Sequence, residues 1–227
     1  MITYDEVLAR LTALKDDTYA AFHFKLLKND SVHLIGVRTP DLRALAKEWR
    51  GEADAFLTFP DEYYEITFLK CALVGMLKYE EFVKRVDLVV PLIDNWATCD
   101  MFTAPCVKKH KEEFLPYIER YLKSDKEFTV RYGLVMLLHY YVETQYLPLI
   151  FESVRNLKKQ DYYIMMGAAW LVAEVLVKHF QEGVRFLEEG CMPKTMHNKA
   201  IQKACESFRI SDKEKDLLKL LRIKENG

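Results

Sequence analysis

The sequence is poor in the residues that form tight turns. Only 8 glycines and 7 prolines occur among 227 residues, roughly 7% of the chain where average usage is about 12%. There is no Asn-Gly or Asp-Gly hairpin turn, and no segment shows sustained alternation of apolar and polar residues. An all-β sandwich or barrel needs many such turns, so these absences argue against that fold class.

Signals for a membrane, a secretory route or a bound metal are also missing. No apolar run approaches the roughly 18 residues of a spanning helix, and the first residues include Asp5 and Glu6 without an apolar core for a signal peptide. The 5 cysteines form no Cys-x-x-Cys pair, and the 6 histidines form no His-Glu-x-x-His or Cys/His metal motif. We therefore expect a cytoplasmic protein with free thiols, no metal site, no cofactor and no membrane partner.

An excess of charge of either sign is absent as well. The chain has 33 Lys and Arg against 34 Asp and Glu, a net charge of −1. The overall charge therefore gives no attraction to nucleic acid, and a polyanionic partner would need a local basic surface. Basic residues do cluster, although such a run is usually only a solvated face. The clusters are Lys108-Lys109-His110-Lys111, Lys158-Lys159, and Lys194 with Lys199 and Lys203.

What the sequence has in abundance is helical periodicity. Half of its residues are hydrophobic, and they recur at the spacing of one helix face. Thr39-Pro40 is a helix-start signal, with Thr39 as the N-cap and Pro40 in the first turn. The expected helices cover residues 5–14, 41–49, 62–77, 80–93, 96–109, 111–122, 127–142, 146–157, 161–180, 194–207 and 212–221.

A weak internal repeat indicates how these helices are organised. Glu127 opens an apolar helix after a charged turn, Tyr162 opens another 35 residues later, and Tyr63 opens an earlier one. A shorter, more polar helix follows each. Helix pairs that recur every 30–40 residues or so are typical of HEAT-like α-solenoids. We therefore predict an all-α superhelix, a curved solenoid of HEAT-like repeats that forms a single domain over residues 1–227.

Two segments contain a tryptophan that could contact a ligand. In a helix that starts near Asp94 and Asn95, Trp96 and Asp100 share one face at spacing i, i+4. An aromatic face beside a carboxylate attracts a cation. Trp170 follows small residues that let a ligand or a neighbouring helix approach closely. The structural alternatives are that Asp94 or Asn95 caps the helix and that both tryptophans belong to the core.

Arg131 is the third candidate, because it stands near the N-terminal end of an apolar helix. The helix dipole does not favour a cation there. Arg131 therefore needs a partner, which could be a buried carboxylate within the fold or a phosphate outside it. The structural alternative is an internal ion pair or a side chain that extends to the solvent.

Taken together, these segments resemble the HEAT-like-repeat DNA glycosylases that excise alkylated purines, the AlkD family of DNA alkylation repair proteins. The likeness covers residues 20–210, through Gly36-Val37-Arg38-Thr39-Pro40 with Leu42-Arg43, Asp94-Asn95-Trp96 with Asp100, Val130-Arg131, Ala169-Trp170-Leu171, and Asn198 to Lys203.

The resemblance implies roles for these residues. Trp96 and Trp170 would flank the damaged nucleotide, Asp100 would lie close to the deoxyribose, and Arg131 would lie close to a phosphate and the carboxylate. The base would not be flipped into a pocket. The expected partner is duplex DNA that contains alkylated bases, bound by a monomer at the nucleoid. Contacts with its phosphates would come from Arg38, Arg43, Lys108, Lys109, Lys158, Lys159, Lys199 and Lys203.

The sequence departs from the family pattern at two places. Ala173 stands where members of the family can carry an arginine, and Phe22 and Phe24 lie only near the position of an aromatic residue that touches DNA. Two alternatives to an enzyme therefore remain: a module that binds DNA structure without chemistry, and a protein-binding solenoid. Retention of Asp100 favours the enzyme, because a pure phosphate binder gains nothing from an inward carboxylate.

Overall fold

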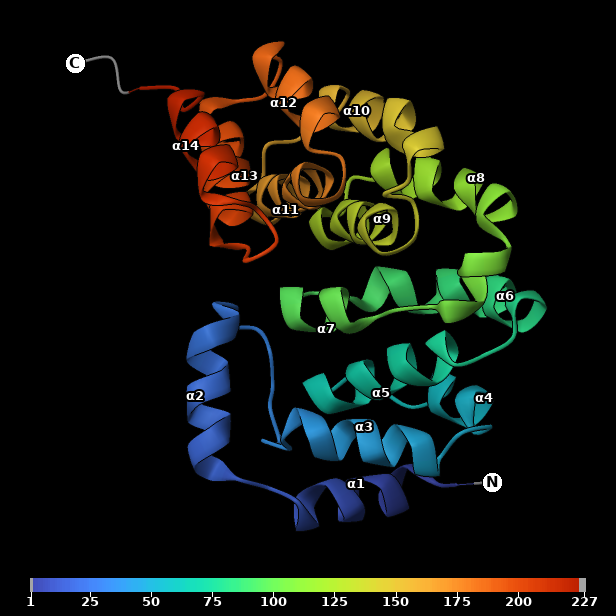
Figure 1. Ribbon diagram of the computed structural model, residues 1–227. Helices are drawn as coiled ribbons and strands as arrows, with labels where there is room; N and C mark the ends of the chain where they lie inside the picture. Colours follow the sequence, from blue (N-terminus) through green and yellow to red (C-terminus); the bar gives the residue numbers. More distant parts are fainter. Residues whose placement is uncertain (1, 225–227) are drawn as a thin grey trace. The chain divides into compact units, whose positions relative to one another are not determined.

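The computed structural model describes residues 2–224, and within them every regular element is helical (Figure 1). These residues form 14 α-helices and three short 3₁₀ helices, with no strand. The predicted all-α fold class is thus confirmed. The helices group into two compact units, residues 1–110 and 111–227. None of the described helices is long and apolar enough to cross a membrane.

Unit 1 is built around α5, which is buried along nearly all of its length. It packs against α3, α4, α6 and α7. The α-helices of unit 1 are α1 (Tyr4–Ala13), α2 (Asp17–Leu27), α3 (Thr39–Glu48), α4 (Ala53–Leu57), α5 (Tyr64–Gly75), α6 (Tyr79–Val89) and α7 (Trp96–Met101), with the 3₁₀ helices η1 (Val90–Leu92) and η2 (Pro105–Lys109).

A buried carboxylate ties the segment before α3 to the first turn of α5. Glu65 is 1% exposed. Its Oε2 accepts the backbone N–H of Ile35 at 3.0 Å, and its Oε1 accepts those of Gly36 at 2.7 Å and Val37 at 3.2 Å. Three donors satisfy a charge that would otherwise be costly to bury. Gly36 has φ +102°, a conformation that glycine adopts without the steric cost of a side chain.

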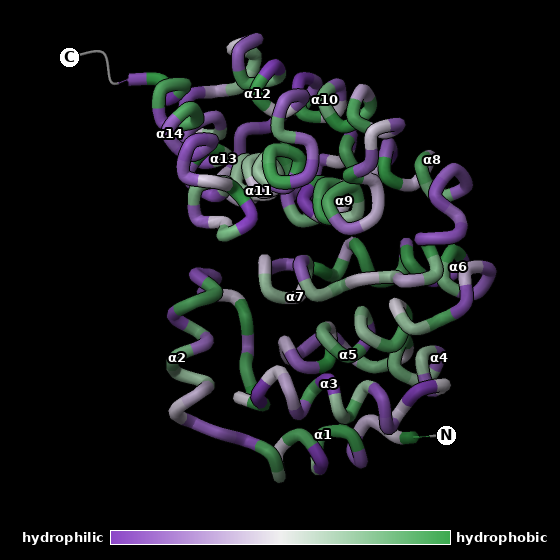
Figure 2. The backbone as a smooth tube through the Cα atoms, viewed as in Figure 1, coloured by the Kyte–Doolittle hydropathy of each residue, from purple (hydrophilic) through white to green (hydrophobic). Residues whose placement is uncertain are grey.

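Unit 2 stacks its most apolar helices side by side. The central helix α11 packs on α9, on α13 and on α12, and α8 packs on α9 (Figure 1). Figure 2 shows that α9 and α11 are largely hydrophobic, as buried helices must be. The elements of unit 2 are α8 (Lys111–Leu122), α9 (Glu127–Tyr140), η3 (Thr144–Tyr146), α10 (Leu147–Arg155), α11 (Tyr162–Lys178), α12 (Phe180–Glu188), α13 (Lys194–Glu206) and α14 (Asp212–Leu220). The predicted repeat is visible here, because Glu127 and Tyr162 each begin a buried helix.

Some predicted helix boundaries are wrong. The expected helix 96–109 ends at Met101, because the backbone leaves the helical conformation at Phe102 and Ala104 before Pro105 begins a 3₁₀ helix. Arg38, not Thr39, occupies the N-cap position of α3. Helices α2, α4 and α12 were not predicted. The domain prediction stays a prediction, because the grouping into compact units describes packing within each unit only.

Candidate functional site

Helix α7 presents Trp96 and Asp100 together, as the i, i+4 spacing predicts. Asn95 begins the helix: its side-chain oxygen accepts the backbone N–H of Thr98 at 2.9 Å. Asn95 is 1% exposed, whereas Trp96 and Asp100 are half-buried. The structural alternative is therefore correct for the cap and wrong for the tryptophan, which lies at the edge of the core. Trp96 Nε1 donates to the carbonyl oxygen of Leu26 at 3.4 Å, which links α7 to the end of α2.

Both side chains line one pocket of unit 1, with a volume of about 320 Å³. Four helices contribute to its wall: α2, α3, α5 and α7. The pocket is mainly aromatic, and it has a carboxylate, Asp100, and a guanidinium, Arg43, on its wall. Arg43 is exposed and has no ion-pair partner among residues 2–224. The pocket therefore offers aromatic faces, one negative group and one positive group to a single ligand.

Helix α2 supplies the part of this pocket that the sequence did not reveal. Tyr19, Phe22 and His23 all line it. Asp16 caps the helix by accepting the backbone N–H of Tyr19 at 2.9 Å. Phe22 is 61% exposed, so an aromatic face lies open beside Trp96. The Asp16 cap and the aromatic spacing i, i+3 between Tyr19 and Phe22 were the available sequence signals.

The two arginines of the α3 segment have different surroundings. Arg38 Nε and Nη2 both donate to Asp16 Oδ2, at 3.0 and 2.7 Å, and its guanidinium lies 5.2 Å from the centre of the Tyr19 ring. The backbone N–H of Tyr19 and the Arg38 guanidinium hold the pKa of Asp16 below its usual range. Arg38 thus fixes the start of α2. Arg43 lines the pocket, so only Arg43 is available to a ligand there.

Arg131 is buried within unit 2. Its side chain is 5% exposed, and Nη1 donates to the backbone carbonyl of Tyr163 at 2.7 Å. Glu127, one turn earlier on α9, accepts the backbone N–H of Tyr163 at 2.8 Å. Arg131 also packs against Gly167 of α11, where an added Cβ would lie 3.4 Å from Arg131 Nη1, an ordinary van der Waals distance. This contact is structural: it joins α9 to the first turn of α11.

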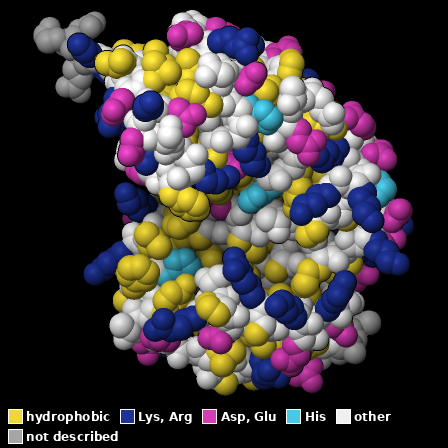
Figure 3. Space-filling model, in the orientation of Figure 1, with side chains coloured by type: hydrophobic (Ala, Val, Ile, Leu, Met, Phe, Trp, Pro, Cys, Tyr) yellow, Lys and Arg dark blue, Asp and Glu magenta, His cyan; other side chains and the backbone are white. Residues whose placement is uncertain are grey.

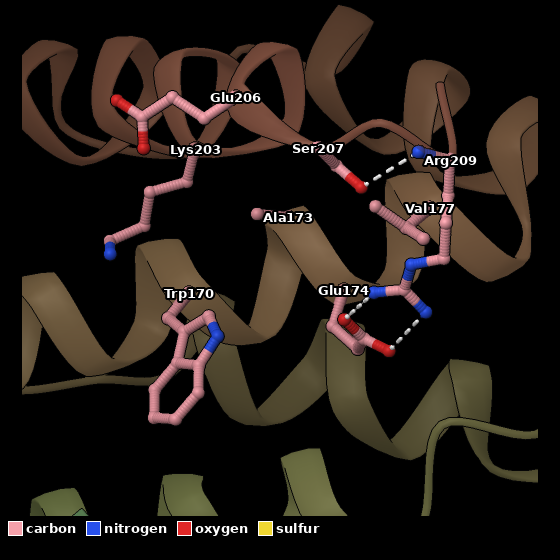
Figure 4. A pocket seen from close by; sticks show the side chains of 8 residues that line it. All are labelled: Trp170, Ala173, Glu174, Val177, Lys203, Glu206, Ser207 and Arg209. Atoms are coloured by element: carbon pink, nitrogen blue, oxygen red, sulfur yellow. Dashed lines mark hydrogen bonds and ion pairs between the residues drawn. The ribbon is translucent and has the colours of Figure 1, made fainter. Parts of the chain in front are cut away.

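Trp170 lines a second pocket, of about 260 Å³, between α11 and α13 (Figure 4). On the side nearest Trp170, the long side chain of Lys203 extends from α13. On the opposite side Arg209 Nη2 pairs with Glu174 Oε2 at 2.9 Å. Ala173 lies between them and is 4% exposed. Trp170 is half-buried and meets His139 edge-on at 6.2 Å.

The remaining predicted basic residues lie on the surfaces of the two units. Lys108 and Lys109 are exposed on η2 of unit 1. In unit 2, Lys158 follows α10, Lys159 lies 3.8 Å from Asp125, and Lys199 donates to Gln202 at 3.1 Å. On the face shown in Figure 3, basic side chains lie among acidic and apolar ones. The DNA-contact role of these residues, and the joint role of Trp96, Asp100, Arg131 and Trp170, stay predictions.

The described residues contain no metal-binding group. No three His, Cys, Asp or Glu side chains within residues 2–224 are placed so that they could hold an ion.

Comparison with known proteins identifies the family of the chain. The chain matches the family described as DNA alkylation repair enzyme over residues 7–208. A search of curated proteins finds no match. The matched range includes α2, α7, α9 and α11, and with them Trp96, Asp100, Arg131 and Trp170. The all-helical fold and the stacked helices of unit 2 are consistent with the HEAT-like fold of the family. This chain belongs to the DNA alkylation repair enzyme family.

Proposed function

We propose that this protein is a DNA glycosylase that excises cationic N3- and N7-alkylated purines from duplex DNA. One observation carries the proposal: in unit 1 an aromatic pocket holds Trp96 and Asp100 on one helix and Arg43 on another. Family membership supplies the class of substrate, alkylated DNA. The pocket offers groups suited to a cationic sugar, a planar ring and a phosphate.

The chemistry of the lesion explains why so few groups suffice. Alkylation at N3 or N7 gives the purine a positive charge, so the base leaves as a neutral molecule without being protonated by the enzyme. What remains is a sugar with the character of an oxocarbenium ion. The enzyme needs to stabilise one cation and to direct one water molecule. It needs neither a paired acid and base nor a closed pocket that grips a flipped base.

Asp100 is suited to that task. Its carboxylate stabilises the positive sugar and orients the water whose oxygen bonds to C1′ as the bond from C1′ to the purine nitrogen breaks. The proton released by that water passes to the carboxylate and then to the solvent. The Trp96 ring favours the same cation through its π face, by about 0.5–2 kcal/mol.

Binding to the duplex comes from cations of both units. Arg43 contacts a phosphate of the nucleotide at the unit 1 pocket, and Lys203 provides a positive charge beside Trp170 in unit 2. Phosphate contacts of this kind position the protein without selecting a sequence. They suit an enzyme that must find a lesion in any sequence context.

Asp100→Asn is the variant that tests this proposal. It keeps the side-chain shape and removes the charge. We expect the excision rate to fall by about 10²–10³-fold, the effect of deleting one preorganised electrostatic contact. Affinity for DNA should hold or increase, because the lost interaction acts in the transition state and an anion has been removed. Asp94→Asn, an exposed neighbour before α7, is the matched control and should excise at the normal rate.

Thermal unfolding separates catalysis from structure. A stable Asp100→Asn protein that binds DNA and excises at the wild-type rate would contradict the assignment of Asp100. If the variant unfolds early, Trp96→Ala becomes the test of the same site, with the same expected loss of excision. A wild-type protein that binds duplex DNA but releases no base would favour the non-catalytic binding module.

A further inference from the structure

A histidine in the unit 1 pocket has no part in the mechanism above. His23 lies on α2 and is 5% exposed. Its ring centre lies 5.2 Å from that of Tyr19, and it meets Tyr64 edge-on at 4.9 Å with an interplanar angle of 86°. Two aromatic rings therefore fix the imidazole in one orientation at the pocket wall.

The ring nitrogens of His23 are open to the pocket. Neither nitrogen makes a hydrogen bond within residues 2–224, and neither is among the fully buried side-chain atoms that lack a partner there. Because the ring itself is nearly buried, the pocket is where a nitrogen can find a partner. A ligand in the pocket can therefore bond to the imidazole in place of water.

The charge of His23 follows from its surroundings. Burial lowers the pKa of His23 below its usual range, so the ring is neutral at neutral pH. The titratable or charged groups that line the pocket with it are Tyr19 on its own helix, Arg43 on α3, Tyr64 on α5 and Asp100 on α7. Burial raises the pKa of Tyr64 as well, so Tyr64 also stays uncharged.

We propose that His23 is a specificity residue of this pocket. Its neutral imidazole hydrogen-bonds the nucleotide seated there, and because it carries no charge a cationic base can lie beside it. A protonated imidazole would instead repel a positively charged alkylpurine while still attracting the phosphates of any DNA. The inference rests on the proposed function for the nature of the nucleotide, but it concerns recognition of the lesion and not the bond cleavage.

The experiment measures binding to a lesion that is not cleaved. The full-length protein is titrated with two duplexes: one contains 7-methylguanine stabilised by a 2′-fluorine atom, and the other is undamaged. The ratio of the two affinities is followed from about pH 7.5 to about pH 5. This whole interval lies above the usual pKa values of carboxylates, so these stay charged. We expect the ratio for the wild type to fall, by up to several-fold, as the pH falls and His23 takes up a proton, because a second positive charge near the lesion repels it.

Three variants complete the design. His23→Gln keeps a donor and an acceptor but does not titrate, so its ratio should stay constant over this pH range. His23→Phe keeps the ring and loses the hydrogen bond, and its ratio at neutral pH should fall by up to about tenfold. His33→Gln, an exposed histidine of the same unit, is the matched control and should follow the wild type.

The outcomes separate this inference from the proposed function. A His23→Gln ratio that falls with pH as the wild-type ratio does would overturn the role of His23 while leaving the glycosylase proposal intact. A wild-type protein without any preference for the lesion at neutral pH would also overturn the role of His23. If the wild type prefers the lesion with the predicted pH dependence but releases no base from a cleavable duplex, His23 keeps its role and the catalytic proposal fails.

Discussion

Removing the charge of Glu65 should destabilise the fold more than any surface change in unit 1. Glu65→Gln keeps the size of the side chain but replaces one acceptor oxygen by an NH₂ group. The carboxylate accepts three backbone N–H groups, from Ile35, Gly36 and Val37. The amide oxygen can retain the Gly36 and Val37 donors. The Ile35 N–H would then face another donor, and it would be buried without a partner.

The magnitude follows from these bonds. A hydrogen bond to a charged group contributes about 1.5–3 kcal/mol, and a buried donor left unsatisfied costs about 1–3 kcal/mol. We therefore expect Glu65→Gln to lower the free energy of unfolding by about 2–5 kcal/mol, a large share of a typical stability of about 5–15 kcal/mol. The segment from Ile35 to Val37 leads directly into α3, so Arg43 on α3 would be held less firmly in its position as well.

Urea unfolding followed by far-ultraviolet circular dichroism measures this change. The matched control is Glu48→Gln, which removes a surface pair with Arg10 whose side chains are 52% and 49% exposed. Such pairs contribute about 0–1 kcal/mol. A loss below about 1 kcal/mol for Glu65→Gln, equal to that of the control, would refute the view that this carboxylate anchors the segment before α3.

Three further predictions concern the same unit. Gly36→Ala should lower the free energy of unfolding by at least ~2 kcal/mol, since φ is +102° and the new Cβ would lie 2.8 Å from Ala20 Cβ and Asp16 O. Gly51→Ala, with φ +107° and open space around it, should lower it less. Equal losses for the two variants would contradict this role of the space around Gly36. Arg43→Gln should reduce the slope of log affinity for DNA against log salt by about one, whereas Arg38→Gln, whose arginine already pairs with Asp16, should reduce it less. His23 should make stability pH-dependent: its pKa is lowered in the folded state, so below about pH 6.5 the unfolded chain binds the proton first. Melting curves should therefore show the wild type losing stability relative to His23→Gln as the pH falls, and parallel curves would rule this out.

Local signals in the sequence predicted the helical fold and the α7 part of the site. The Asn95 cap and the spacing of Trp96 and Asp100 involve neighbouring residues, so the pattern alone places both side chains on one face. The 35-residue echo likewise located the starts of α9 and α11. Such features depend on backbone periodicity and not on the rest of the fold.

The rest of the site depends on contacts between residues that are far apart in the sequence, which local patterns do not show. Helix α2 leaves Phe22, Phe24 and Leu26 exposed, so it lacks the apolar stripe by which a helix is normally recognised. The place of His23 against Tyr64 depends on how α2 meets α5. For Arg131 the sequence left two possible partners open, a carboxylate and a phosphate. The structure adds a backbone carbonyl, that of Tyr163, which no side-chain pattern reveals.

Release of a damaged base by the purified protein is the decisive test of glycosylase activity. Methylated duplex DNA is incubated with the wild-type chain and with Asp100→Asn, and free 7-methylguanine and 3-methyladenine are quantified against the spontaneous loss from the same DNA. We expect release by the wild type well above the spontaneous rate, and release by the variant to be about 10²–10³-fold slower. Release by the wild type at no more than the spontaneous rate would contradict it.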